Sequence, residues 1–458
     1  MSTIDLTSDQ LDAAWDTFNT IISGDEEAIQ LDLNFNAWNL NTGDLCGTVL
    51  AIFEKLELIN YIGSTKEEIL AFIADVEKGY FCNPYHSFLH AVDVCAMLYY
   101  FLVDLNIKNY LDQPSVLALI IAGLCHDIGH PGLNNLYQIN ARTELALAFE
   151  DISVLENHSC CLTGNLLAKH QLLRKGNSKC PLSVNNLEDM IVENILSTDM
   201  AHHFTLLEDL SHILDEWPSS PARSTIDANC KPESNNELNI EEFRRKLCEL
   251  LLHAADISNA VRPWSLCKSW SDMVVQEFFH QGDLEKRNSL PISCNMDRNV
   301  SSQPQIALDF DEFIVRPFFE ILARLLPPCV VFLDNLEANR FRWSEVKKQR
   351  PHRRQDTASD NSPYSSRRVS FSAGTVEIPE FYCEELRRYS GDFIRTSKPR
   401  RSLSRPGSQT RYKQKREGCP PDKMNVLNSI LQHSLSRIPS NDSLNGAMAF
   451  DASAPTVS

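Results

Sequence analysis

Apolar side chains recur every three to four residues from Ile4 to about Trp343, and this periodicity constrains the fold more than any other feature. Clear helical patterns cover residues 45–60, 66–77, 89–105, 113–126 and 241–254. Few stretches alternate apolar and polar residues as a half-buried strand does. We therefore predict an all-α fold built from many helices of medium length.

Charge and composition change near residue 344. Residues 1–343 contain 23 Lys+Arg and 49 Asp+Glu, a formal −26, whereas residues 344–458 contain 20 and 12, a formal +8. The basic tail is rich in Ser, Arg, Pro and Asn, so it cannot bury enough apolar surface to offset its ordering entropy. We expect it to be mostly disordered, with short helices at 379–388 and 422–435.

Charge and sorting signals also limit the surroundings in which the protein works. The acidic part disfavours nucleic acid as a partner, because phosphate binding needs positive surface. The start MSTIDLTSDQ lacks the basic and apolar regions of a signal peptide, and the longest apolar run, 116–125, is about half a membrane span. The 14 cysteines are scattered and contain no C-x-x-C pair. These features predict reduced thiols and a cytoplasmic location.

Histidines and carboxylates gather in four segments of the acidic part. They contain His86 with His90, His126 with Asp127 and His130, Glu156, and Asp256. The first pair is spaced i, i+4, which places two imidazoles on one helical face. An adjacent His-Asp pair can offer one nitrogen and one carboxylate oxygen to neighbouring metal positions.

Two of these carboxylates follow strongly apolar runs. Asp127 comes after LALIIAGLC and Asp256 after LCELLLHAA. A buried carboxylate is costly unless it is paired or bound to a metal, which favours a metal centre. The residues taken singly leave another interpretation open, in which the histidines belong to the core and the carboxylates cap helices.

A resemblance to a known family decides between these interpretations. The motifs YHSFLHAVDV, HDIGHPGLNN, ELALAFEDISVLENH, STDMAHHF, ADISNAVRPW, EFFHQGDLEK and LPISCNMDR occur in the order and spacing of the class I 3′,5′-cyclic-nucleotide phosphodiesterases, within the His-Asp metallohydrolase superfamily. The stretch NNLYQINARTELA most resembles the cGMP-preferring ninth class. The resemblance implies an N-terminal extension at 1–34, a catalytic domain at 35–345 and a Ser/Arg-rich tail at 346–458.

The resemblance also implies roles for individual residues. It makes His90, His126, Asp127 and Asp256 ligands of Zn²⁺, with Asp127 bridging to Mg²⁺ or Mn²⁺ and a metal-activated hydroxide attacking phosphorus. His86 would protonate the departing O3′ of a cyclic nucleotide, cGMP or cAMP, and Glu277 would orient His86. His130 and Glu156 would orient waters and ligands at the metals. Two departures from the family pattern, Gly129 and Ser159, leave the metal ligands intact.

The base pocket is implied by the same resemblance. Tyr85, Met200 and Asn259 match positions near the substrate. For the glutamine that bonds the base and the aromatic residue that clamps it, we favour Gln305 and Phe310 with an insertion between them. The alternative places Leu308 at the clamp position.

The basic tail contains sequences of the kind that protein kinases recognise. Arg367-Arg368-Val369-Ser370 fits a basophilic kinase site, with looser matches at Ser402 and Ser440. A solvated tail with chance matches is the alternative. The basic tail could also contact an anionic membrane, and a homodimer is left open.

Two alternatives to a cyclic-nucleotide phosphodiesterase are kept. One is a hydrolase of nucleoside polyphosphates, and the other is a catalytically impaired module that binds cyclic nucleotide or acts as a scaffold.

Overall fold

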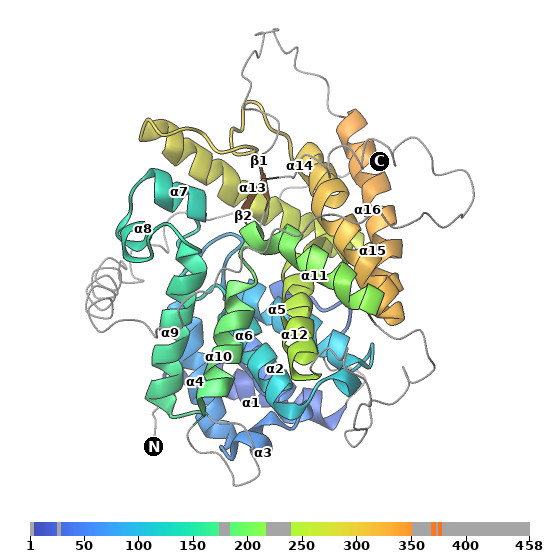
Figure 1. The fold of residues 1–458 in the computed structure, drawn as a ribbon. Coiled ribbons are helices and arrows are strands. Elements are labelled where there is room, and N and C mark those ends of the chain that lie inside the picture. Colours follow the sequence, from blue (N-terminus) through green and yellow to red (C-terminus); the bar gives the residue numbers. More distant parts are fainter. Residues whose placement is uncertain are drawn as a thin grey trace, which may run out of the picture. The chain divides into compact units, whose positions relative to one another are not determined.

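The computed structural model describes residues 4–24, 29–173, 184–216, 240–349, 368–371 and 374–377. Every described residue belongs to one compact unit, which lies within Met1–Thr396. Within these ranges the regular elements are helical apart from one short hairpin, which confirms the predicted all-α fold (Figure 1).

The helices follow one another through short connections. Their bounds are α1 Ser8–Ser23, α2 Thr42–Lys55, α3 Leu58–Ile62, α4 Lys66–Gly79, α5 Phe88–Leu102, α6 Gln113–Cys125, α7 Asn135–Asn140, α8 Glu144–Ala148, α9 Val154–His170, α10 Val184–Leu196, α11 His203–Glu216, α12 Ile240–Asp256, α13 Trp264–Arg287, α14 Gln303–Phe310, α15 Arg316–Leu325 and α16 Val330–Gln349. Shorter helical turns are η1 Ala37–Asn39, η2 Ile107–Tyr110, η3 Met200–His202, η5 Ile257–Val261, η7 Pro327–Cys329 and a π-helical turn, η6 Asp311–Val315.

Helices α5, α6 and α12 form the centre of the described bundle and contact one another (Figure 1). Side chains are buried on nearly every face of α5 and α6, and along the C-terminal half of α12. A helix that is apolar all round must be enclosed by others. Helix α6 meets this need by packing against α10 as well as α5 and α12. Asp112 begins α6 by accepting a hydrogen bond from the backbone of Ser115, and Pro114 lies in the first turn.

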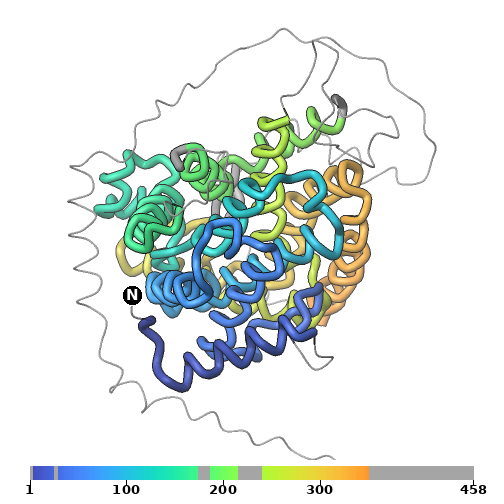
Figure 2. The backbone as a smooth tube through the Cα atoms, turned by 90° about the horizontal axis from the view of Figure 1, so that it is seen from below, coloured from blue at the N-terminus to red at the C-terminus, as the bar shows by residue number. Residues whose placement is uncertain are grey.

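The N-terminal helix α1 packs closely along α2. A Cβ atom at Gly43 would lie 2.3 Å from the carbonyl oxygen of Gln10, and one at Gly47 would lie 2.2 Å from that of Ala14. Larger side chains would therefore push the two helices apart. Figure 2 shows α1, in dark blue, along the outer edge of the bundle.

A buried ion pair holds the segment that follows α1. Arg262 is fully buried, and its Nη1 donates to both carboxylate oxygens of Asp93 at 3.0 Å. The same guanidinium also donates to the backbone carbonyls of Leu33 and Phe35. Charge pairing in the core thus fixes the chain that leads into α2.

Two short strands are the part of the tail that the structure describes. Strands β1 Arg368–Phe371 and β2 Gly374–Glu377 form an antiparallel hairpin in which Ser370 stands opposite Thr375. Both strands contain β-branched or aromatic residues, which favour this conformation. The helices expected at 379–388 and 422–435 lie outside the described residues. Among the helices that the structure describes, none combines the length and apolarity needed to cross a bilayer.

Candidate metal centre and active site

The predicted metal donors lie at neighbouring ends of the three central helices. His90 is in the first turn of α5, Asp256 is the last residue of α12, and His126 and Asp127 directly follow α6. The chain turns away after α6 because Gly129 adopts a left-handed conformation, with φ of 78°. Packing of the central helices therefore brings together side chains that are far apart in the sequence.

These four side chains, called the donor cluster below, lie close together. The Nε2 atom of His90 lies 3.0 Å from Oδ1 of Asp256 and 3.7 Å from Oδ2 of Asp127. The Nε2 atom of His126 lies 3.1 Å from Oδ2 of Asp127 and 3.5 Å from Oδ1 of Asp256. Donors about 2.1 Å from one ion stand roughly 3 to 3.5 Å apart, so His90, His126 and Asp127 are spaced for a common divalent cation, with Asp256 close to both histidines.

The hydrogen bonding of His126 supports this fit. Its Nδ1 lies 3.0 Å from the carbonyl of Gly123, so Nδ1 carries the proton in the neutral ring. The buried Nε2 has no hydrogen-bond partner and faces two carboxylates. Two carboxylates facing this nitrogen call for a positive charge at this position, which a proton on Nε2 or a bound metal ion supplies. Burial lowers the pKa of His126, but Asp127 and Asp256 outweigh burial and raise that pKa well above the ordinary value.

An acid–base pair stands beside the donor cluster. Nδ1 of His86 makes a short contact with Oε1 of Glu277, and Oε2 of Glu277 accepts from the backbone amides of Tyr85 and His86 at 3.1 and 3.2 Å. Burial lowers the pKa of His86, but the carboxylates of Glu277 and Asp127 raise it to about 9. Burial raises the pKa of Glu277, whereas His86 lowers it to about 2. His86 is therefore cationic at neutral pH, and Glu277 fixes its ring.

His130 stacks on His86 and differs from it in charge. The two ring centroids are 3.9 Å apart and the planes are tilted by 23°. Nδ1 of His130 accepts from the backbone amide of Gly132 at 3.0 Å, which leaves a proton on Nε2. Burial and the neighbouring His86 lower the pKa of His130 to about 3. Asn83, which sequence reasoning missed, donates to the backbone carbonyls of both histidines, at 2.8 and 2.7 Å, and so joins their loops.

A second buried network is centred on the carboxylate of Glu156. Asn135 donates to both oxygens of Glu156, at 3.1 and 2.9 Å. Burial and the nearby Asp199 raise the pKa of Glu156 to about 8. Asp199 accepts from the hydroxyl of Ser153 at 2.8 Å and caps η3. Sequence reasoning missed the roles of Asn135 and Asp199, although both lie within quoted motifs and their polar side chains flank the histidine segments.

The two departures from the family pattern lie together. A Cβ atom at Gly129 would lie 2.8 Å from Nε2 of His158 and 2.5 Å from Leu162, in addition to the left-handed backbone. The hydroxyl of Ser159 donates to the carbonyl of Ile128 at 3.0 Å. Both residues therefore shape the turn after α6.

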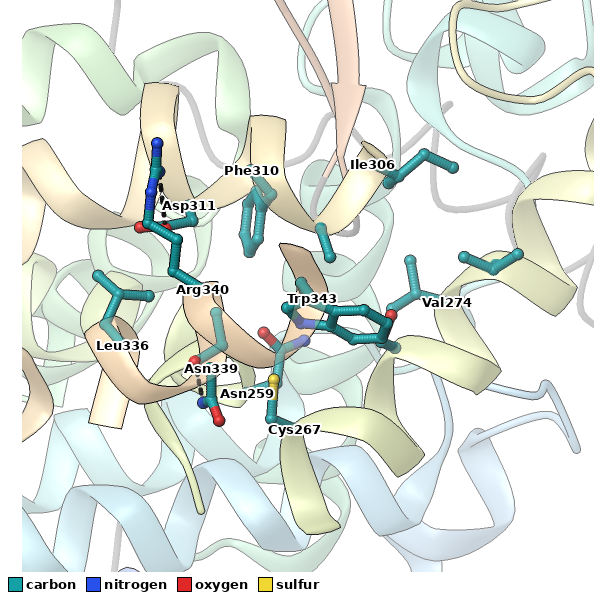
Figure 3. A pocket seen from close by; sticks show the side chains of 14 residues that line it. Asn259, Cys267, Val274, Ile306, Phe310, Asp311, Leu336, Asn339, Arg340 and Trp343 are labelled. Atoms are coloured by element: carbon teal, nitrogen blue, oxygen red, sulfur yellow. Dashed lines mark hydrogen bonds and ion pairs between the residues drawn. The ribbon is translucent and has the colours of Figure 1, made fainter. Parts of the chain in front are cut away.

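A pocket is formed by α13, α14, α16, η5 and η6 (Figure 3). Its lining residues are Asn259, Ala260, Cys267, Ser271, Val274, Val275, Ile306, Ala307, Phe310, Asp311, Leu336, Asn339, Arg340 and Trp343. Most of the wall is apolar or aromatic. The Asp311–Arg340 ion pair, 3.0 Å between Oδ2 and Nη1, closes one end. Such a space suits a planar organic ring with few polar groups.

The structure brings some of the predicted substrate residues to this pocket. Phe310 and Asn259 line it, and Nδ2 of Asn259 donates to the hydroxyl of Tyr85 at 2.9 Å. Tyr85 itself packs against His90, with ring centroids 4.6 Å apart. Met200 is fully buried in η3 and is not among the lining residues. Leu308, the alternative clamp, is also absent from the lining.

The position of Gln305 differs from the prediction. Its Nε2 donates to Oδ1 of Asp309 at 2.6 Å, and its Oε1 accepts from Lys347. Gln305 does not line the pocket. The reason is helical geometry: five residues separate Gln305 from Phe310, which places their side chains about 140° apart around the axis. The structure thus does not place Gln305 in the lining, and its role as the base-binding glutamine stays a prediction.

An all-helical fold with a buried cluster of histidine and aspartate donors defines a protein of the His-Asp metal-binding class. The chain matches the family described as 3′5′-cyclic nucleotide phosphodiesterase over residues 85–336, and it belongs to that family. The resemblance inferred from the motifs is thereby confirmed.

Individual relatives agree with this membership. The chain is 33% identical to the 3′,5′-cyclic-nucleotide phosphodiesterase regA of Dictyostelium discoideum, over 71% of this chain and 39% of that protein. It is 30% identical to the human high affinity cGMP-specific 3′,5′-cyclic phosphodiesterase 9A, over 69% and 50%. The chain thus spans half or less of these two relatives. The phosphodiesterase domain of the RhoPDE fusion protein from Salpingoeca rosetta is 28% identical with a TM-score of 0.61, over 69% of this chain and 95% of that domain.

Proposed function

We propose that this chain hydrolyses a 3′,5′-cyclic nucleotide, preferably cGMP, to the 5′-monophosphate. The observation that carries the proposal is the cationic His86, fixed by Glu277, whose ring centroid lies 6.2 Å from that of His90 in the donor cluster. An acid is needed where an ester oxygen leaves, and a cation site is needed where phosphate charge accumulates. The relative named cGMP-specific supports guanine as the base.

The donor cluster is proposed to hold Zn²⁺, since two imidazoles and two carboxylates form a set that zinc accepts. Asp127 is the most exposed donor, with 16% of its side chain accessible, and would share its carboxylate with Mg²⁺ or Mn²⁺. Bound divalent ions neutralise phosphate charge and lower the pKa of water, which supplies the nucleophile. Glu156 and Asn135 would orient the polar groups around the second ion.

His86 is proposed to complete the bond cleavage. As the bond between phosphorus and O3′ breaks, the Nε2 proton of His86 moves to O3′, which leaves as a hydroxyl group. Glu277 holds the opposite nitrogen and stabilises the cationic ring before the transfer. His130 is neutral and stacks on His86, so it restricts the ring without competing as an acid.

The test combines metal analysis with turnover of cGMP and cAMP. We expect the purified chain to contain zinc and to hydrolyse cGMP with the higher kcat/KM. His86→Ala should retain zinc and lose turnover by about a hundredfold or more, because general acid catalysis is removed. Asp256→Ala should lose both the bound zinc and the turnover. A zinc-loaded chain that binds but hydrolyses neither nucleotide would favour the binding-module alternative.

The tail adds a proposal of regulation. Ser370 follows the kinase-type sequence within β1, and β2 contacts η3, which contains Met200. A phosphate on Ser370 would add negative charge to this hairpin. Ser370→Glu should change the KM for cGMP, with Ser402→Glu as the control outside the hairpin. If Ser370→Glu and Ser402→Glu have the same KM for cGMP, this proposal is wrong. A cytoplasmic location, membrane contact through the tail and a homodimer are also proposed, for testing by cell fractionation and sedimentation.

A further inference from the structure

The pocket needs a polar group for the base, and Gln305 cannot supply it while bonded to Asp309 and Lys347. Ala307, which does line the pocket, has no polar side chain. On the same helix, Gln303 lies seven residues before Phe310, almost two full turns, so the two share one face. Gln303 is 7% exposed and points its amide at α13.

The amide of Gln303 is fixed in one orientation. Its Nε2 donates to Oδ1 of Asp272 at 2.7 Å and to the hydroxyl oxygen of Ser271 at 3.1 Å. Asp272 is ion-paired with Lys268 at 2.6 Å, so its carboxylate is charged and can only accept. Turning the amide over would direct its oxygen at this carboxylate. Gln303 is therefore held as a donor toward Ser271.

This arrangement leaves the hydroxyl proton of Ser271 for the pocket. Ser271 lines the pocket, and its oxygen already accepts one hydrogen bond from Gln303. Serines in helices often donate to the carbonyl four residues earlier, as Ser269 does to Ser265 at 3.0 Å. Among the described residues no such bond occurs at Ser271. The pocket wall thus presents a hydrogen-bond donor.

We propose that Ser271, positioned by Gln303 and Asp272, reads the nucleotide base in this chain and selects guanine over adenine. Guanine presents the acceptor O6 where adenine presents a donating amino group. A fixed donor pairs with O6 and cannot pair with that amino group in the same way. Phe310 and Val274, both in the wall, supply apolar contact for the ring. The inference rests on the proposed function, because the pocket must receive a cyclic nucleotide.

The experiment compares Ser271→Ala with Ser269→Ala, a control on the same helix outside the pocket lining. A neutral hydrogen bond is worth about 1 kcal/mol, so Ser271→Ala should raise the KM for cGMP roughly fivefold or more, with kcat and the KM for cAMP within about twofold. Ser269→Ala should change neither KM. Asp272→Asn, which frees the Gln303 amide to turn, should reduce the preference for cGMP without abolishing turnover.

The outcomes separate this inference from the proposed function. An active wild-type chain whose cGMP-to-cAMP preference is unchanged in Ser271→Ala overturns the inference alone. Equal loss for both nucleotides also overturns it, because the hydroxyl would then serve folding rather than reading. If the chain binds nucleotide without turnover, the proposed function fails and the same comparison of Kd values by calorimetry decides the inference. A chain that binds neither nucleotide overturns both.

Discussion

The charge of Glu277 controls the pH range in which His86 can act as an acid. Glu277→Gln keeps the size of the side chain and removes the negative charge that raises the pKa of His86 to about 9. Burial, the largest influence on His86, is then opposed only by Asp127 and Asp256, so the pKa should fall toward the ordinary histidine value of about 6.5. A change from about 9 to about 6.5 is worth roughly 3 kcal/mol.

The sign of the effect follows from the protonated form being the acid. In the wild-type chain the raised pKa keeps His86 protonated below about pH 9, so kcat/KM for cGMP should fall only as the pH rises through that value. In Glu277→Gln the fall should begin near pH 6.5. The protonated fraction at pH 8 would drop roughly 30-fold, whereas at pH 6 it would stay within about twofold.

The assay is a profile of kcat/KM between pH 5.5 and 10 for the wild type, Glu277→Gln and Asp283→Asn. Asp283 lies on the same helix and pairs with Arg298 at the surface, so its variant should keep the wild-type profile. A Glu277→Gln profile that is lowered equally at every pH would refute the reasoning, because the carboxylate would then act by position rather than by charge.

Three further predictions concern stability, each measured by urea unfolding. Gly129→Ala should cost about 2 kcal/mol or more, since a left-handed residue with a Cβ is strained and would also meet His158; an unchanged midpoint would contradict this. Arg262→Leu should cost about 3–5 kcal/mol by leaving Asp93 buried without its partner, and the double variant with Asp93→Leu should regain part of the loss. If the double variant regains no stability, Arg262 and Asp93 contribute to stability independently of each other. Ser159→Ala should cost about 1–3 kcal/mol through the unpaired carbonyl of Ile128, and a smaller loss would place water there.

The helical fold was predictable from the sequence on physical grounds, whereas the proposed metal donors also depended on the family resemblance. Apolar periodicity identifies helices, and a carboxylate that ends a fully apolar helix, as Asp127 and Asp256 do, must be compensated inside the core. Periodicity does not say which helix ends meet. The contact between His86 and Glu277, 191 residues apart, came only from the family resemblance.

The base pocket was harder to predict because it depends on which face of one helix points inward. Counting back from Pro317 located Phe310 correctly in the lining, but it gave no angle for the glutamine. Helical geometry places Gln303, rather than Gln305, on the face of Phe310. The bond from Gln303 to Ser271 joins two helices, and no local pattern in the sequence signals it.

The most direct test of the central claim is the product formed from cGMP in water enriched in oxygen-18, analysed by mass spectrometry and phosphorus NMR. Water attack on phosphorus with proton transfer from His86 to O3′ predicts 5′-GMP carrying one heavy oxygen on its phosphate. Formation of 3′-GMP, or a metal-loaded chain that leaves cGMP intact, would contradict the account.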